Sequence, residues 1–345
     1  MDSGAARVYR YHRRVPSSAP ATLFADTPAF ASHALPVPGG HVLSVQEYGC
    51  ADGLAAVVLH GGPGSGCSPL LRRVFDPARW RIVCPDQRGA GASRPRGGTA
   101  NNGTAELLDD LEHIRARLGI SRWVVVGGSW GAALALAHAA AAPQAVAALL
   151  LRASFLARPQ DIAAFFGPLS LEQLAAELDA PDVAVRERAA LAWWRREQEL
   201  ACTHAAEPQG EALAAQVDRL RVQAHYLRHG CWLQSPTLLE RCEAVPQVPV
   251  HLIHARDDRV CPPEGATLLQ RRLRGATLQW LDGAGHDAAH PAMVAAMRAA
   301  LERYAQCGAF AASDEGRAER RAAPKPARIP SGDRPTYPSD EGFSS

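Results

Sequence analysis

The chain alternates short apolar runs with longer segments whose apolar residues recur at helical spacing. The apolar runs predict buried strands, at 55–60, 80–84, 122–126 and 145–151. Leucine and isoleucine at helical spacing predict an amphipathic helix over 104–118, and an alanine-rich run predicts a buried helix over 131–142. This alternation is typical of a parallel sheet covered on both faces, so the sequence predicts an α/β fold.

The alternation stops near Phe155, and the pattern is helical from there to about Glu243. Strands are again predicted at 248–255 and 276–281, with helices near 263–273 and 291–306. We therefore expect an α/β domain interrupted by a helical cap. The expected parts are a loosely ordered segment 1–33, a first core part 34–154, a cap 155–243, a second core part 244–306 and a disordered tail 307–345.

Composition narrows the possible functions. The 345 residues are 47% hydrophobic and 21% charged, which suits a globular chain and excludes a wholly disordered or membrane-spanning one. The formal net charge of +2 indicates neither a nucleic-acid partner nor a membrane partner. Lys325, in a proline-rich stretch, is the single lysine, which argues against a pyridoxal-phosphate Schiff base or a Walker A site.

The eight cysteines are dispersed, and no two have C-x-x-C spacing. This spacing argues against a zinc or thioredoxin-type motif. Dispersed cysteines in a long chain are typical of a reduced protein, and the arginine-rich N-terminal stretch 1–15 is not followed by an apolar signal segment. We expect a cytoplasmic protein.

The segment Gly127-Gly128-Ser129-Trp130-Gly131 fits the pattern G-x-S-x-G between a predicted strand and a predicted helix. A nucleophile elbow requires this context, because flanking glycines permit the strained turn that presents the serine. The alternative is a glycine-rich turn of a nucleotide-binding protein, in which Ser129 only caps the helix. The G-x-G-x-x-G phosphate-binding pattern is missing here, which favours the nucleophile.

A serine nucleophile needs a base, and His286 follows the strand that ends near Leu281. His290 is the nearest competitor, while a core or loop position is expected for His60, His138, His251 and His254. The acid is expected after the strand 248–255, where Asp257 and Asp258 are both candidates.

A glycine-rich loop follows the first strongly predicted strand, running from His60 to Gly66. A tetrahedral oxyanion needs two backbone N–H donors. Trp130, the residue after the nucleophile, supplies one of them in this interpretation, and Gly61 or Gly62 supplies the other. An ordinary glycine turn is the alternative.

Read together, several motifs resemble the proline iminopeptidase family of α/β-hydrolase-fold serine peptidases. They are His60-Gly-Gly-Pro-Gly, Asp86-Gln-Arg-Gly-x-Gly-x-Ser93, Gly127-Gly-Ser-Trp-Gly131, Leu151-Arg152 and Asp258-x-x-Cys-Pro262. The resemblance implies that Asp258 is the acid, that no metal or organic cofactor is used, and that the substrates are small peptides with an N-terminal proline.

Removal of an N-terminal residue requires a group that holds the substrate amine, and a carboxylate does so through charge-assisted hydrogen bonds. The resemblance assigns this role to Glu197, in the stretch Ala192–Glu197, and to Gln223, which stands where the family has a glutamate. Trp232 is expected to line the pocket for the proline ring.

Two other functions remain open at this point. One is an esterase or amidase of the same fold, acting on acyl substrates without a free amine. The other is a non-catalytic binding protein, which the presence of all three triad residue types at workable spacing disfavours.

Overall fold

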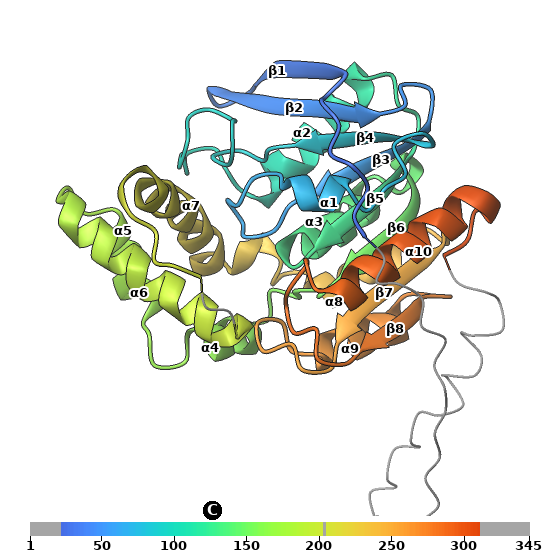
Figure 1. Ribbon diagram of the computed structural model, residues 1–345. Coiled ribbons are helices and arrows are strands. Elements are labelled where there is room, and N and C mark those ends of the chain that lie inside the picture. Colours follow the sequence, from blue (N-terminus) through green and yellow to red (C-terminus); the bar gives the residue numbers. More distant parts are fainter. Residues whose placement is uncertain (1–21, 203–204, 311–345) are drawn as a thin grey trace, which may run out of the picture.

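The structure, a computed structural model, describes residues 22–202 and 205–310. An eight-stranded sheet forms the centre of this part of the molecule (Figure 1). The strand order is β1-β2-β4-β3-β5-β6-β7-β8. β1 and β4 both pair with β2 in antiparallel fashion, and the other neighbours are parallel. The strands are β1 (Ala31–Val37), β2 (His41–Gly49), β3 (Leu54–Leu59), β4 (Trp80–Pro85), β5 (Trp123–Gly128), β6 (Val146–Arg152), β7 (Val250–Ala255) and β8 (Thr277–Leu281). The mostly parallel sheet confirms the predicted α/β fold.

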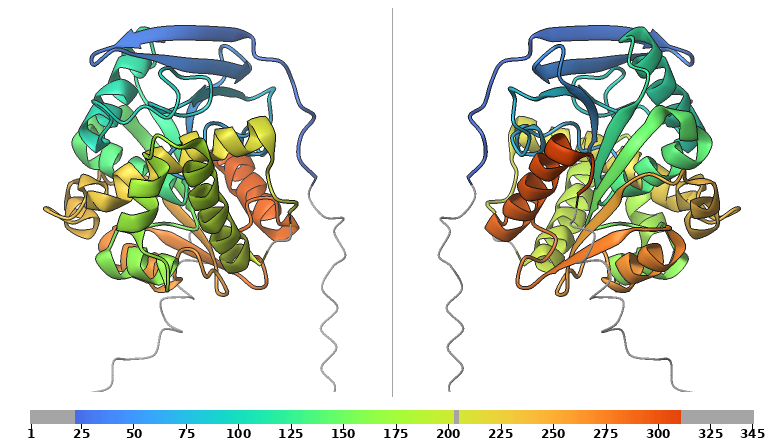
Figure 2. Two further views of the ribbon diagram at one scale, coloured as in Figure 1. Left: turned by 90° about the vertical axis from the view of Figure 1, so that its left-hand side faces the viewer. Right: turned by 90° about the vertical axis from the view of Figure 1, so that its right-hand side faces the viewer.

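The parallel strands are covered on both faces, because successive side chains point to opposite sides of a sheet. Val57 and Leu59 of β3 belong to one buried cluster together with residues of α2, α3 and α9. Ala56 and Val58 belong to a second cluster together with residues of α10 and of the segment around α1. Figure 2 shows α10 on one side of the sheet and α2 and α3 on the other. These helices are α1 (Pro69–Arg72), α2 (Thr104–Arg117), α3 (Trp130–Ala141), α9 (Glu264–Arg272) and α10 (Pro291–Cys307), and the turn η1 (Pro143–Ala145) precedes β6.

Helices fill the chain between β6 and β7. Among them α5, α6 and α7 pack on one another beside the sheet (Figure 1), whereas α8 and η3 lie against α3 of the core. The last part of the expected cap therefore packs on the core, where Leu238 is buried. The elements are α4 (Pro159–Phe166), α5 (Leu171–Leu178), α6 (Val183–Ala201), α7 (Gly210–Arg228), η2 (Gly230–Trp232), α8 (Leu238–Arg241) and η3 (Cys242–Ala244).

The ends of the described chain differ in part from the expectation. Residues 31–33, expected to be loosely ordered, begin β1, because β1 forms a hairpin with β2. The turn of this hairpin uses Gly39 and Gly40, both at positive φ. At the other end, Cys307 closes α10 and Phe310 is buried against Tyr304, so the expected tail does not begin at 307. Residues 1–21 and 311–345 lie outside the described residues.

Candidate active site

Ser129 stands on a sharp turn between β5 and α3. Its φ of 56° and ψ of −123° lie outside the regions that side chains favour, and this strained geometry is typical of a nucleophile elbow. Two glycines make the turn possible. A Cβ on Gly131 would lie 2.1 Å from the Leu59 carbonyl oxygen, and one on Gly127 would lie 2.2 Å from the Gly131 carbonyl oxygen. The G-x-S-x-G spacing is therefore dictated by backbone packing around the serine.

His286 and Asp258 meet across the ends of two neighbouring strands. Asp258 follows β7 and His286 follows β8, and His286 Nδ1 donates to Asp258 Oδ2 at 2.9 Å. An ionised carboxylate only accepts hydrogen bonds, so this contact places the proton on Nδ1 and leaves the Nε2 lone pair available.

The Asp258 carboxylate is buried, but protein N–H groups donate hydrogen bonds to it. Its Oδ1 accepts from the backbone N–H groups of Val260 at 2.9 Å and Cys261 at 2.8 Å. Burial acts to raise the pKa of Asp258, but His286 and the Cys261 N–H outweigh it and hold the pKa below its ordinary value. The acid therefore keeps its negative charge at neutral pH.

The rival candidates have other contacts. Asp257 accepts a hydrogen bond from the Gly285 N–H at 3.3 Å and is exposed. His290 caps the first turn of α10 by accepting from the Ala292 N–H. His254 Nε2 donates to the Cys261 carbonyl oxygen at 2.9 Å, and burial lowers its pKa. The structure thus pairs His286 with Asp258 and leaves Asp257 outside that pair.

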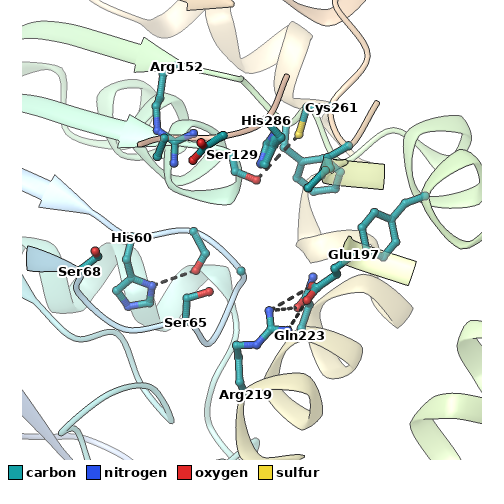
Figure 3. A pocket seen from close by; sticks show the side chains of 18 of the residues that line it. His60, Ser65, Ser68, Ser129, Arg152, Glu197, Arg219, Gln223, Cys261 and His286 are labelled. Atoms are coloured by element: carbon teal, nitrogen blue, oxygen red, sulfur yellow. Dashed lines mark hydrogen bonds and ion pairs between the residues drawn. The ribbon is translucent and has the colours of Figure 1, made fainter. Parts of the chain in front are cut away.

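The Ser129 hydroxyl lies beside the buried thiol of Cys261. Within the described residues its hydrogen-bond partner is Cys261 Sγ, at 3.8 Å, and His286 borders the same cavity (Figure 3). Burial and the neighbouring Asp258 charge raise the pKa of Cys261, so this thiol stays protonated beside the serine. In the sequence, Cys261 stands out only as a member of the Asp258-x-x-Cys-Pro262 motif.

The glycine loop after β3 lies against the serine turn. A Cβ on Gly61 would be 3.4 Å from the Gly128 carbonyl oxygen and 3.6 Å from Ser129 Cβ. His60 holds the base of the loop: its Nε2 accepts from the Gln87 N–H at 3.0 Å, and its Nδ1 donates to the Gly61 carbonyl oxygen at 2.9 Å. Trp130 starts α3, and the first N–H groups of a helix have no acceptor within the helix. Gly61 and Trp130, two of the residues expected to supply these backbone donors, therefore lie next to Ser129.

A cavity of about 430 Å³ opens in front of Ser129, between the sheet and the cap (Figure 3). Ser129, His286, Gly61 and Gly62 border it from the core, and Glu197 and Gln223 border it from α6 and α7. The structure thus brings both expected amine-binding residues to the same cavity as the serine.

Trp232 does not border this cavity, so its expected role there is wrong. Its ring stacks on His229 with centroids 4.8 Å apart, contacts Tyr226, and lies over Gly103 at the start of α2. With 38% of its surface exposed, Trp232 covers the far end of α7. The sequence pattern does not separate the two positions, because an aromatic residue of the cap can either line a pocket or pack the cap against the core.

Two arginines in the cavity wall escaped the sequence analysis as site residues. Arg152 at the end of β6 is buried next to Gly128, and burial lowers its pKa. Arg219 on α7 binds Glu197 and Gln223. No sequence signal distinguishes Arg219 from the many other arginines, because its partner Glu197 belongs to a different helix.

The described residues contain no group of three or more His, Cys, Asp or Glu side chains that could hold a metal ion. In the same part of the chain, no helix combines the length and apolar composition needed to span a membrane.

Comparisons with known proteins agree with this architecture. The model of the alpha/beta hydrolase fold matches residues 57–291. A proline iminopeptidase of Xylella fastidiosa (strain 9a5c) is 34% identical over 316 residues, which cover 82% of this chain and 99% of the relative. A proline iminopeptidase of Arabidopsis thaliana is 32% identical over 313 residues, or 82% of each chain.

Among solved structures, the crystal structure of a proline iminopeptidase from Mycobacterium smegmatis superimposes with a TM-score of 0.57 at 19% identity, covering 81% of this chain and all of that one. This likeness concerns the fold, which the strand order and the elbow already indicate. From the sequence relatives and the matching family model together, we conclude that the chain belongs to the proline iminopeptidase family of α/β-hydrolase-fold enzymes.

Proposed function

We propose that this protein is a serine aminopeptidase that releases an N-terminal residue, preferentially proline, from small peptides. The observation that carries the proposal is the cavity itself. Ser129 on its elbow, His286 with Asp258 bonded behind it, and Glu197 bring a nucleophile, a base and a carboxylate to one cavity of peptide size. The relatives' name, proline iminopeptidase, points to the same activity.

The chemistry follows from the positions of these groups. Ser129 Oγ attacks the carbonyl carbon of the first residue, and His286 Nε2 takes the hydroxyl proton. For this transfer the hydroxyl rotates from Cys261 toward the imidazole. Asp258 stabilises the cationic ring. The C–N bond then breaks, and His286 returns the proton to the leaving amine.

The oxyanion and the second half of the reaction use the same groups. Backbone N–H groups of Trp130 and of Gly61 or Gly62 stabilise the developing negative oxygen. Water, deprotonated by His286, then attacks the acyl-enzyme; the Ser129 Oγ–carbon bond breaks, and His286 returns the proton to Ser129 Oγ. No step requires a metal or an organic cofactor.

Release of an arylamine from a proline arylamide by the full chain tests the proposal. Ser129→Ala should lower kcat by at least about 10³-fold, because the attacking oxygen is removed while the cavity stays intact. Circular dichroism of the variant serves as the folding control. Undiminished turnover by Ser129→Ala, or the absence of wild-type activity on every aminoacyl arylamide, would refute the peptidase.

An esterase or amidase acting on acyl groups without a free amine is the second candidate. One observation favours it: Arg219 already binds the Glu197 carboxylate, which lowers the negative charge available to a substrate amine. Comparing a proline arylamide with its N-acetyl derivative and a short acyl ester separates the two. The peptidase should lose the N-acetyl substrate, whereas an esterase or amidase should not discriminate against it.

The cysteines bear on the cellular location of the protein. All eight cysteines are described and unpaired, which is typical of a chain that stays reduced. We infer a cytoplasmic enzyme that encounters peptides with a free N-terminus, with no role for nucleic acids or membranes.

A further inference from the structure

The carboxylate that faces the cavity from the cap already has a cationic partner. The guanidinium of Arg219 binds both oxygens of Glu197: Nη1 donates to Oε1 at 3.1 Å, and Nη2 donates to Oε2 (Figure 3). Such a paired, planar contact is the most specific form of an arginine–carboxylate interaction. A substrate amine that approaches Glu197 therefore encounters a carboxylate whose two oxygens both already accept hydrogen bonds from Arg219.

Arg219 also engages the second residue expected to hold the amine. Its Nη1 donates to Gln223 Oε1 at 3.2 Å, one helical turn further along α7, and its Nε donates to Gln216 Oε1 at 2.8 Å. The side chains of Arg219 and Glu197 are only 16% and 21% exposed. Three partners and partial burial hold the guanidinium in place, so it is a fixed part of the cavity wall.

The charges of this group cancel. Glu197 carries one negative charge, Arg219 one positive charge and Gln223 none, so the end of the cavity that would receive an ammonium group is neutral overall. A cation placed there gains attraction from Glu197 but is also repelled by the adjacent Arg219 guanidinium. A neutral group meets neither effect.

We propose that Arg219 is a specificity-determining residue that competes with the substrate's N-terminal ammonium for Glu197. The inference rests on the proposed function and deepens it. Because of Arg219, the enzyme binds N-terminal amines more weakly than Glu197 alone would allow, although it still prefers substrates that carry a free amine. The residue acts on substrate binding and takes no part in bond breaking.

The test uses a ligand that reports on the amine site without being cleaved. Pyrrolidine is a cation of the size of the proline ring, and its competitive inhibition of a short acyl ester's hydrolysis by the full chain measures its affinity. Arg219→Gln should lower the pyrrolidine Ki by about tenfold, the effect of roughly 1.4 kcal/mol. Arg219→Lys, which keeps the positive charge, should stay near the wild-type Ki.

Two further variants show whether the effect passes through Glu197. In Glu197→Gln/Arg219→Gln the gain in affinity should vanish, because the carboxylate that attracts the cation is gone. Arg195→Gln is the matched control. Arg195 lies on α6 and forms an equally paired contact with Glu207 outside the cavity, through Nε at 2.6 Å and Nη2 at 3.0 Å, so its loss should not change Ki.

An unchanged or higher Ki in Arg219→Gln would overturn the inference, and so would a tenfold gain that persists without Glu197. A parallel loss of ester hydrolysis and of the thermal midpoint would show that Arg219 only supports the cap, which also overturns it. Failure of the peptidase proposal is a separate result, since it is judged from proline arylamide turnover by the wild type and not from Ki.

Discussion

At the scale of single residues, the site depends on a few side chains whose protonation is set by their contacts. The Nδ1 proton of His286 is held by Asp258, and His286 together with the Cys261 N–H keeps the Asp258 carboxylate ionised. Cys261 stays a neutral thiol beside Ser129 because burial raises its pKa. These contacts leave the imidazole as the proton acceptor next to the serine.

Asp258→Asn should therefore lower kcat/KM by about 10³- to 10⁴-fold, since an amide can donate to Nδ1 and favours the tautomer whose Nε2 already carries a proton. The measurement is steady-state turnover of the best substrate at pH 7. Asp257→Asn is the matched control, because Asp257 is exposed and bonds only the Gly285 N–H within the described residues. It should change kcat/KM less than threefold or so. The reverse ranking of the two variants would mean that the acid has been misassigned.

At the scale of elements, the Asp86–Ser93 motif serves to hold loops together. Asp86 accepts from the backbone N–H groups of Cys67 at 2.7 Å and Ala92 at 2.8 Å. Arg88, from the same motif, forms a buried pair with Asp110 of α2, with both contacts at 2.7 Å. Its Nη1 also donates to a carbonyl oxygen in the β1–β2 turn, that of Pro38, at 3.0 Å. One guanidinium thus joins the β4 loop, α2 and the hairpin.

Removing Asp110, the partner of Arg88, should destabilise the fold without altering the catalytic residues. Asp110→Ala should lower the free energy of unfolding by about 3–5 kcal/mol, because a buried guanidinium loses its counter-charge. Urea unfolding followed by tryptophan fluorescence measures this. The neighbouring Asp109 is exposed on the same helix, and Asp109→Ala should have an effect below about 0.5 kcal/mol. Equal effects of the two substitutions would contradict the role of the buried pair.

At the scale of the whole molecule, several histidines are packed in their neutral form. Burial lowers the pKa of His60, His138 and His254, and for His138 the pKa falls to about 4. His138 is completely buried, and its Nε2 accepts from Trp123 Nε1 at 3.2 Å. The unfolded chain takes up these protons near pH 6.5, whereas the folded chain resists them.

The free energy of unfolding should consequently fall as the pH drops from about 6.5 to about 4, and His138 alone accounts for up to about 3 kcal/mol of this loss. Urea unfolding at a series of pH values checks it. His138→Gln, whose amide oxygen can still accept from Trp123, should flatten the slope. His113→Gln, at an exposed position of α2, should leave the slope as in the wild type. Identical slopes for His138→Gln and the wild type would show that His138 does not contribute.

The local pattern of apolar and polar residues was sufficient to predict most strands and helices of the core. The expected strand 122–126 corresponds to β5 and the expected helix 104–118 to α2 within two residues at each end. Ser129 was found because its glycine spacing is a local steric requirement that every such turn must meet. The hairpin of β1 and β2 was missed, since its residues alternate weakly and its pairing with β4 is a contact distant in sequence.

What the sequence determined by itself was therefore whatever depends on neighbours along the chain: the order of strands and helices, the serine turn, and a histidine and an acidic pair placed after two strands. The tertiary structure decided the contacts between separate elements. It selected Asp258 over Asp257 as the partner of His286, moved Trp232 away from the cavity, and placed Arg219 on Glu197. The physical reason is that charge pairing and ring packing depend on distance in space, which the folding of α6 onto α7 and of the cap onto the sheet alone establishes.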